Sequence, residues 1–138
     1  DAGAPRLRRG LVIGQPLTGT GLLDTAAMQA VSTEIERWMQ AQGIEQVCYK
    51  GHPKDPQREL WRPGYEVLEL DEPLELWLAH ERFDAVAGVR SSALLFAKQL
   101  YGEGTTVAAF GWDRMRFKSA AERRAMAAAF QAAGVLLR

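Results

Sequence analysis

The sequence predicts an α/β domain of the doubly wound type, built on a parallel sheet of five or six strands. Short apolar runs alternate along the chain with longer segments in which apolar residues recur at helical spacing. Strands that alternate with helices pair in parallel through right-handed crossovers. The chain has 138 residues, 47% of them apolar and 25% charged, which is the size and composition of one globular domain. We therefore expect residues 1–138 to form a single domain.

Each expected strand is a short apolar run that ends at glycine, proline or a polar turn. The five expected strands are residues 11–13, 47–49, 65–70, 84–88 and 105–110. Residues 135–137 are either a sixth strand or a frayed end. Each expected helix is bounded by a capping residue or a stop residue. The four helices run from Asp24 to Gly43, from Pro73 to about His80, from Ser91 or Ser92 to Gly102, and from Ser119 to Gly134.

Charge and cysteine content exclude some classes of protein. Basic and acidic residues balance at 17 each, so net charge gives no attraction for nucleic acid. Five cations near the C-terminus form either a solvated helix face or a patch for an anionic acceptor or a membrane surface. They are Arg114, Arg116, Lys118, Arg123 and Arg124. The single cysteine, Cys48, rules out an internal disulfide and is expected to be buried. No run approaches the ~18–20 apolar residues of a membrane span, and the polar, basic residues 1–10 indicate no signal peptide.

Unusual residues follow several expected strands at the edge where their carboxyl ends meet. The segments are Gly14-Gln15-Pro16, Gly51-His52-Pro53-Lys54, Glu69 to Glu72, and Arg90-Ser91-Ser92. In a doubly wound, Rossmann-like sheet, ligands bind outside the carboxyl ends of the strands. The sequence therefore predicts a ligand site at this edge.

His52 is the first candidate for that site. It lies between Gly51 and Pro53, and the following proline favours an extended turn. Its ring can donate a hydrogen bond to a phosphate, and Lys54 can add a point charge. The alternative is an ordinary surface histidine in a turn.

Two helix starts supply further candidates. Ser91 and Ser92 open a helix whose free N–H groups and dipole favour an anion, although a serine there can simply be an N-cap. Glu72 precedes a helix and either accepts hydrogen bonds from ribose hydroxyls or compensates the helix dipole. With His52 at the same edge, these residues are typical of a phosphate-binding site.

Other motifs are missing or incomplete. Gly19-Thr20-Gly21 is half of a dinucleotide fingerprint, but Asp24 occupies the place of its third glycine. The sequence has no phosphate-loop lysine motif, no nucleophile elbow and no metal-ligand spacing. We expect no metal and no cofactor.

The His-Pro turn at His52-Pro53 and the pair Ser91-Ser92 resemble the two signature motifs of bacterial sialyltransferases. The sequence is most similar to lipooligosaccharide sialyltransferases and capsular polysialyltransferases. Gly14-Gln15-Pro16-Leu17 and Asp71-Glu72-Pro73 add to this resemblance, which extends from about Leu11 to Trp112.

The resemblance implies one half of a GT-B-type glycosyltransferase, the C-terminal half, which binds the donor CMP-sialic acid. His52 would contact the donor phosphate and stabilise the departing CMP, while Ser91 and Ser92 hold the same phosphate. Gln15, Pro53, Lys54 and Glu72 would complete the donor site, with Glu72 as the ribose ligand. The implied reaction is inverting, metal-independent sialyl transfer to a glycan acceptor. The implied location is the cytoplasm, with the periphery of the inner membrane as the alternative.

The resemblance leaves the general base open. In the family, the base lies in the N-terminal half or in the loop after the first strand of this half. Asp24 is the only acid in that loop, and it is either the base or the cap of its helix. A complete enzyme needs two domains of ~150 residues. The partner is then an N-terminal acceptor domain or a second copy of this chain, and one half alone can bind the donor without turnover.

Three other functions remain open from the sequence. A non-catalytic module that binds a nucleotide or phosphosugar would use the same edge without a base. A receiver-like or flavodoxin-like domain is disfavoured because residues 14–16, after the first strand, contain no acid. A purely structural interaction domain would bind no nucleotide and would be indifferent to His52.

Overall fold

The computed structural model describes residues 6–138, which contain a parallel sheet of six strands. The strands are β1 (Arg9–Ile13), β2 (Gln46–Lys50), β3 (Glu66–Val67), β4 (Ala85–Gly88), β5 (Thr106–Ala109) and β6 (Leu136–Leu137). The helices are α1 (Thr25–Ala41), α2 (Leu74–Leu78), α3 (Ser92–Tyr101) and α4 (Ala120–Ala132), with a 3-10 turn, η1, at Gly102–Gly104. The strand order β3-β2-β1-β4-β5-β6 confirms the predicted doubly wound, Rossmann-like α/β fold.

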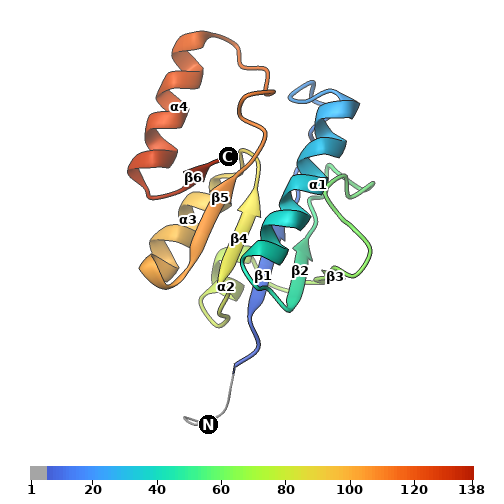
Figure 1. Ribbon diagram of the computed structural model, residues 1–138, viewed down its shortest axis with the longest axis vertical. Coiled ribbons are helices and arrows are strands. Elements are labelled where there is room, and N and C mark those ends of the chain that lie inside the picture. Colours follow the sequence, from blue (N-terminus) through green and yellow to red (C-terminus); the bar gives the residue numbers. More distant parts are fainter. Residues whose placement is uncertain (1–5) are drawn as a thin grey trace.

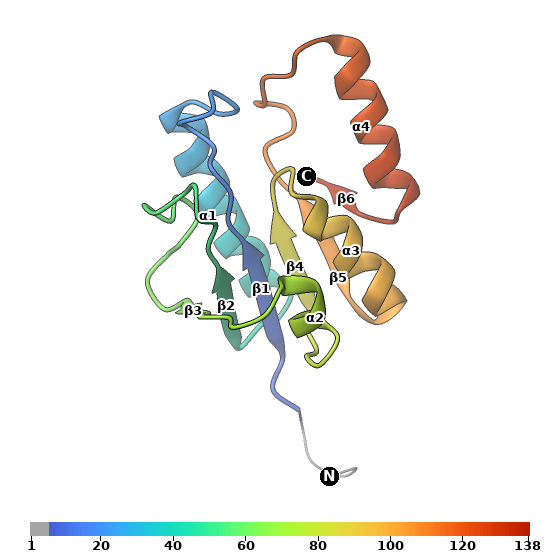
Figure 2. The same cartoon turned by 180° about the vertical axis from the view of Figure 1, so that it is seen from behind.

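The strand order reverses between β1 and β4. From β1 the chain moves outward to β2 and β3, then crosses back to β4 and moves outward again to β5 and β6. Opposite views show α1 on one face of the sheet and α2 and α3 on the other (Figure 1, Figure 2). The carboxyl ends of the strands point upward in Figure 1, toward the loops that precede α1 and α4. This edge at the reversal is where doubly wound sheets bind ligands.

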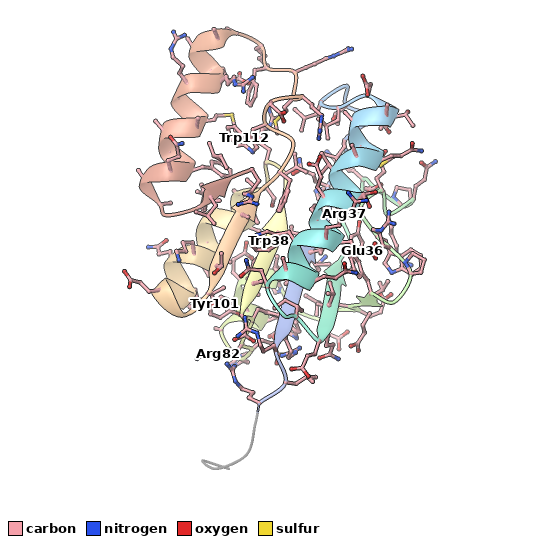
Figure 3. The ribbon with its side chains drawn as sticks, viewed as in Figure 1. Glu36, Arg37, Trp38, Arg82, Tyr101 and Trp112 are labelled. Atoms are coloured by element: carbon pink, nitrogen blue, oxygen red, sulfur yellow. The ribbon has the colours of Figure 1, made fainter. Side chains whose placement is uncertain are left out.

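The apolar face of α1 forms part of the core. The face of α1 that carries Val31, Ile35, Trp38 and Met39 is buried against the sheet. The Trp38 ring meets Phe110 edge-on, with 5.6 Å between ring centroids, and Figure 3 shows Trp38 between α1 and the sheet. Fully burying one large apolar side chain stabilises a fold by about 1.5–3 kcal/mol. This packing fixes α1, and with it the loop that follows β1.

The two edge strands are only two residues long. The third strand was predicted over residues 65–70, but only Glu66 and Val67 pair with β2. An edge strand has a single neighbour, and residues 69–72, three of which are acidic, have no second strand to hold them in the ladder. At the opposite edge, Leu136–Leu137 pairs with β5, so the C-terminal segment is a sixth strand.

One helix ends earlier than predicted, and the start of another contacts a distant segment. The second helix ends at Leu78 rather than near His80. The capping box before α4 is half formed, because the Ser119 hydroxyl accepts a hydrogen bond from the Glu122 N–H at 3.0 Å. The Glu122 carboxylate lies instead 3.7 Å from the Arg90 guanidinium. A contact between distant segments thus replaces the local half of the motif.

The burial expected for Cys48 is confirmed. Cys48 is buried in β2. Trp38 and Trp112 are buried, whereas Trp61 is 39% exposed. Among residues 6–138, no helix combines the length and the apolar character that crossing a bilayer requires.

Candidate functional site

A cavity of about 270 Å³ lies at the carboxyl edge of the sheet, beside the reversal of strand order. Its walls come from the end of β1, the β2–β3 loop, the segment before α2 and the start of α3. The lining residues are Ile13, Gly14, Lys50, Gly51, His52, Pro53, Leu70, Glu72, Pro73, Leu74, Ser91 and Ala93. We refer to this cavity as the His52 pocket. It brings together four of the site residues expected from the sequence: His52, Pro53, Glu72 and Ser91.

At the base of the His52 pocket, β1 and β2 leave no room for a side chain at position 14. A Cβ on Gly14 would overlap the Tyr49 hydroxyl and lie 2.9 Å from Tyr49 Cζ. The Gly14 N–H donates to the Lys50 carbonyl at 2.8 Å, which joins the ends of the two strands. Tyr49 is fully buried, and its hydroxyl has no hydrogen-bond partner among residues 6–138. Burial raises the pKa of Tyr49 far above its ordinary value, so the hydroxyl remains protonated.

The imidazole of His52 is oriented by the backbone of its own turn. Its Nδ1 accepts a hydrogen bond from the Lys54 N–H at 3.0 Å. The His52 carbonyl accepts another from the Asp55 N–H at 2.9 Å. The neutral ring therefore carries its proton on Nε2, which can donate to a ligand. The Lys54 side chain is exposed and does not line the His52 pocket, so the contribution of Lys54 here is its backbone N–H.

Lys50 is a cation in the pocket that the sequence analysis missed. It is the last residue of β2, and its Nζ donates to the Gly51 carbonyl at 2.7 Å. Lys50 lines both the His52 pocket and the cavity next to it. The available signal was a basic residue at the end of a buried strand, directly before the Gly-His-Pro turn.

The two adjacent serines have different positions. Ser91 is the N-cap of α3, and its hydroxyl accepts a hydrogen bond from the Ala93 N–H at 3.2 Å. Ser92 is the first residue of α3, is exposed, and does not line the His52 pocket. Ser91 and the first-turn N–H groups of α3 therefore form one wall, the arrangement in which helix N-termini bind anions.

Gln15 and Asp24 hold the scaffold around the pocket. The Gln15 amide oxygen accepts a hydrogen bond from the Arg90 N–H at 2.8 Å and ties the end of β1 to the β4–α3 turn. Asp24 Oδ1 accepts one from the Ala27 N–H at 2.8 Å and caps α1. Of the acidic side chains in residues 6–138, only Glu72 lines the pocket. Within the same residues, no group of three or more His, Cys, Asp or Glu side chains is placed to hold a metal ion.

A second cavity, of about 400 Å³, lies on the other side of the His52 turn. It shares residues 50–53 with the His52 pocket and is also lined by Asp55 and Arg58. Asp55 is buried, and that burial raises its pKa even though N–H groups of Glu59 and Arg58 donate to it. The His52 turn is therefore a wall shared by two neighbouring cavities.

Glu59 joins the β2–β3 loop to the β1–α1 loop. Its carboxylate accepts hydrogen bonds from the Leu17 N–H at 2.9 Å and the Thr18 N–H at 3.2 Å, and also from the Thr18 hydroxyl. Burial by itself would raise the pKa of Glu59, but these three hydrogen bonds outweigh it and lower the pKa. The loop that carries His52 is thus held against the loop that follows β1.

Glu59→Gln is expected to destabilise the protein by about 1–2 kcal/mol at neutral pH, because the neutral amide loses charge-assisted hydrogen bonds. The folded-state pKa of Glu59 lies below its ordinary value of 4.5, so its stabilising effect is present above that pH. The effect is lost as the pH falls through the folded-state pKa. Urea unfolding of both proteins between pH 3 and pH 7 should show that the difference between their free energies of unfolding becomes smaller as the pH falls. The exposed Glu103, changed to Gln, should show no such trend, and a difference independent of pH would contradict the role of the charge.

Solved structures with similar folds include two proteins of different activity. Thermosulfurimonas dismutans KpsC, a beta Kdo 2,4 transferase, aligns with 88% of this chain at a TM-score of 0.53 and 21% identity. This chain spans only 41% of that protein. TvaF, an FMN-dependent cysteine decarboxylase from thioviridamide biosynthesis, aligns over 97% of this chain and 90% of its own at a TM-score of 0.51 and 13% identity. At these identities the two structures establish the fold alone.

Comparison at the level of sequence identifies the family. No curated protein matches the chain. The model of the family described as alpha-2,8-polysialyltransferase (POLYST) matches residues 8–109. That range includes β1 to β5 and every residue that lines the His52 pocket. Because the match covers well over half of the sequence, the chain belongs to the alpha-2,8-polysialyltransferase family.

Proposed function

We propose that this chain is the donor-binding half of a sialyltransferase. It binds CMP-sialic acid and supports inverting, metal-independent transfer of the sialyl group to a glycan acceptor. The observation that carries the proposal is the composition of the His52 pocket in a member of the polysialyltransferase family. Three polar side chains from distant segments, His52, Glu72 and Ser91, line one cavity at the reversal of the sheet.

The chemistry of one end of the pocket suits a phosphate. His52 Nε2–H can donate, and the Lys50 ammonium supplies a positive charge. The Ser91 hydroxyl and the N-terminus of the ten-residue helix α3 add further donors. Charge-assisted hydrogen bonds of this kind are roughly twice as strong as neutral ones. The phosphate of CMP is the group we assign to this end.

Glu72 is the residue that contacts the ribose of the nucleotide in this proposal. Its carboxylate is an acceptor in a pocket otherwise lined by donors and apolar groups. A ribose presents two vicinal hydroxyl donors, which a carboxylate can accept together. Glu72 lies before α2, on a segment distinct from the His52 turn and from Ser91. We assign it to the ribose hydroxyls.

The transfer step explains why donors around the phosphate matter. The bond between the anomeric carbon of the sialyl group and the phosphate oxygen breaks, and its electron pair stays on CMP. The acceptor oxygen forms the new bond from the opposite face, and its proton passes to a base. Negative charge grows on the phosphate as the sugar becomes oxocarbenium-like, so preorganised donors stabilise the transition state more than the ground state. His52 and Ser91 take this role.

The base and the acceptor site complete the proposal. Asp24 is the candidate base within this chain, although its carboxylate caps α1 and lies outside the His52 pocket. The alternative is a carboxylate from a facing half, either an acceptor domain or a second copy of this chain. General-base catalysis requires the carboxylate within hydrogen-bond reach of the acceptor hydroxyl.

A second candidate function is a non-catalytic module that binds a nucleotide or phosphosugar. It is favoured by the position of the acids, since Glu72 alone lines the pocket and Asp24 is engaged as a cap. Binding of CMP alone does not distinguish such a module from the transferase. Release of CMP from CMP-sialic acid in the presence of a sialyl acceptor distinguishes them when the chain is joined to its acceptor-binding half, because only the transferase then turns over.

Glu72→Gln tests the proposed orientation of the nucleotide. It is expected to weaken CMP binding about tenfold, because hydrogen bonds to the charged carboxylate are lost. Binding of 2′,3′-dideoxy-CMP, which lacks both hydroxyls, should be unchanged by the same substitution. Glu75→Gln is the matched control, since Glu75 is an exposed acid on α2 that does not line the pocket. Equal losses for CMP and its dideoxy analogue would contradict the assignment of Glu72.

A further inference from the structure

A third cavity, with basic walls, lies at the same edge of the sheet as the His52 pocket. Its volume is about 450 Å³. Thr20 and Gly21 of the β1–α1 loop form one side, and Arg116 and Lys118 of the β5–α4 loop form the other. Arg90, from the β4–α3 turn, also lines it. Figure 1 shows the loops before α1 and α4 side by side at the top of the molecule, and the Arg116 N–H donates to the Leu22 carbonyl at 2.9 Å.

The charge in this cavity is not neutralised locally. Three cations and one carboxylate, Glu122, line it, although the whole chain has no net charge. The Arg90 guanidinium lies 3.7 Å from the Glu122 carboxylate, a loose pair. Within residues 6–138, Arg116 and Lys118 form no ion pair. Two exposed cations therefore face the cavity with their charges available to an anion.

Only some of the five cations near the C-terminus line this cavity. Arg114 forms a 2.9 Å ion pair with Glu34 of α1. The guanidinium of Arg123 stacks over the Phe117 ring, 5.8 Å from its centroid. The sequence offered a solvated face and an anion patch as alternatives for all five cations. The fold instead directs Arg116 and Lys118 into a cavity and engages Arg114 elsewhere.

The basic cavity and the His52 pocket lie on either side of one turn. Arg90 lines the first and the next residue, Ser91, lines the second. The Gln15 amide fixes this turn by accepting the Arg90 N–H at 2.8 Å. Arg90 and Ser91 are consecutive residues. A phosphate bound at Ser91 would therefore lie next, along the chain, to an arginine that lines the other cavity.

The remaining walls suit a sugar rather than a bare ion. Leu22 and Met126 supply apolar surface, and Glu122 supplies an acceptor for hydroxyl groups. Arg90 also lies over the Phe117 ring, 5.9 Å from its centroid, which limits its freedom to move away. Cations for a carboxylate, an acceptor for hydroxyls and apolar surface for a ring face are what recognition of a sugar acid requires.

We propose that the cavity lined by Arg90, Arg116 and Lys118 is a second subsite that binds the carboxylate of a sialyl residue. The inference rests on the proposed function and extends it, because it gives the sugar acid its own cationic site apart from the nucleotide phosphate. The sialyl residue belongs either to the donor or to a polysialyl acceptor. Both present the same carboxylate and hydroxyl groups to the subsite.

Titration of the 138-residue chain with an α2,8-linked sialic acid trimer tests the subsite, with the methyl-esterified trimer as the uncharged probe. Arg116→Gln is expected to weaken binding of the charged trimer about tenfold, the scale of a lost charge-assisted contact. Arg116 and Lys118 are exposed, so these substitutions leave the fold intact, and Lys118→Gln provides a second variant. Arg124→Gln removes the same charge from an exposed position on α4 outside the cavity and should have no effect. Measurements at about 0.15 M salt screen distant charges.

Titration with CMP and with CMP-sialic acid separates this inference from the proposed function. If Arg116→Gln weakens CMP-sialic acid but not CMP, the donor sugar occupies the subsite. If Arg116→Gln weakens binding of the trimer while CMP saturates the His52 pocket, the acceptor occupies the subsite. Equal effects of Arg116→Gln and Arg124→Gln would overturn the subsite, as would displacement of the trimer by an equal concentration of inorganic phosphate. CMP binding that survives in those cases would leave the proposed function standing.

Discussion

His52→Ala is expected to lower the affinity for CMP at least about tenfold. The neutral imidazole carries its proton on Nε2, because Nδ1 already accepts the Lys54 N–H at 3.0 Å, and His52 lines the pocket. Loss of a hydrogen bond to a charged phosphate costs about 1.5–3 kcal/mol, and each 1.4 kcal/mol is a factor of ten in the dissociation constant. His52 is exposed in a turn, so the substitution should change stability little. Calorimetric titration of both proteins measures the effect.

Two controls separate a contact with CMP from a role in shaping the turn. In His52→Asn, the amide oxygen can still accept the Lys54 N–H, but the Nε2 donor is absent. We expect this variant to bind CMP as weakly as the alanine variant. The chain has only one other histidine, His80, which is exposed beyond α2 and outside the pocket. If His80→Ala weakened CMP binding as much, or if His52→Asn bound CMP normally, the proposed hydrogen bond from His52 Nε2 to CMP would be wrong.

Gly14→Ala is expected to destabilise the protein by about 1–3 kcal/mol, the cost of overpacking a well-packed interior. The new methyl group would overlap the hydroxyl of Tyr49 and lie 2.9 Å from Tyr49 Cζ. Tyr49 is fully buried and cannot move aside without displacing β2, which leads into the His52 turn. Urea unfolding should therefore show lower stability, and calorimetry should show weaker CMP binding.

The clash at position 14 has a matched control and a partial rescue. Gly19 has nothing within 4 Å of an added Cβ, so Gly19→Ala should have little effect on stability. Tyr49→Phe removes a hydroxyl that has no hydrogen-bond partner among residues 6–138, and should be close to neutral. Combined with Gly14→Ala, it should restore part of the lost stability. In a double-mutant cycle, the double variant should then be more stable than the sum of the two single effects predicts. Additive losses would contradict the steric account.

The sequence predicted the fold and the edge that carries the candidate site because both depend on local signals. Buried strands ended at glycine, histidine or serine turns, and parallel pairing brings such ends to one edge. His52, Glu72 and Ser91 meet there as expected. The predicted extent of β3 was wrong because an edge strand is held by only one neighbouring strand. The residues of a strand do not by themselves reveal that it lies at an edge.

The parts that could not be predicted depend on contacts between distant segments. Glu59 binds Leu17 and Thr18 across more than 40 residues, and no local pattern marks that pairing. Lys50 was missed because the direction of a side chain at the end of a strand depends on the following turn. Ser91 and Ser92 are equivalent in sequence, and only the observed start of α3 at Ser92 places Ser91 in the pocket and its neighbour outside.

The proposed function requires that the His52 pocket bind the CMP part of a sialyl donor. Calorimetric titration of the 138-residue chain with CMP, beside UMP and GMP, measures this binding. We expect one CMP to bind per chain, more tightly than either other nucleotide. Absence of CMP binding, or equal binding of all three nucleotides, would contradict it.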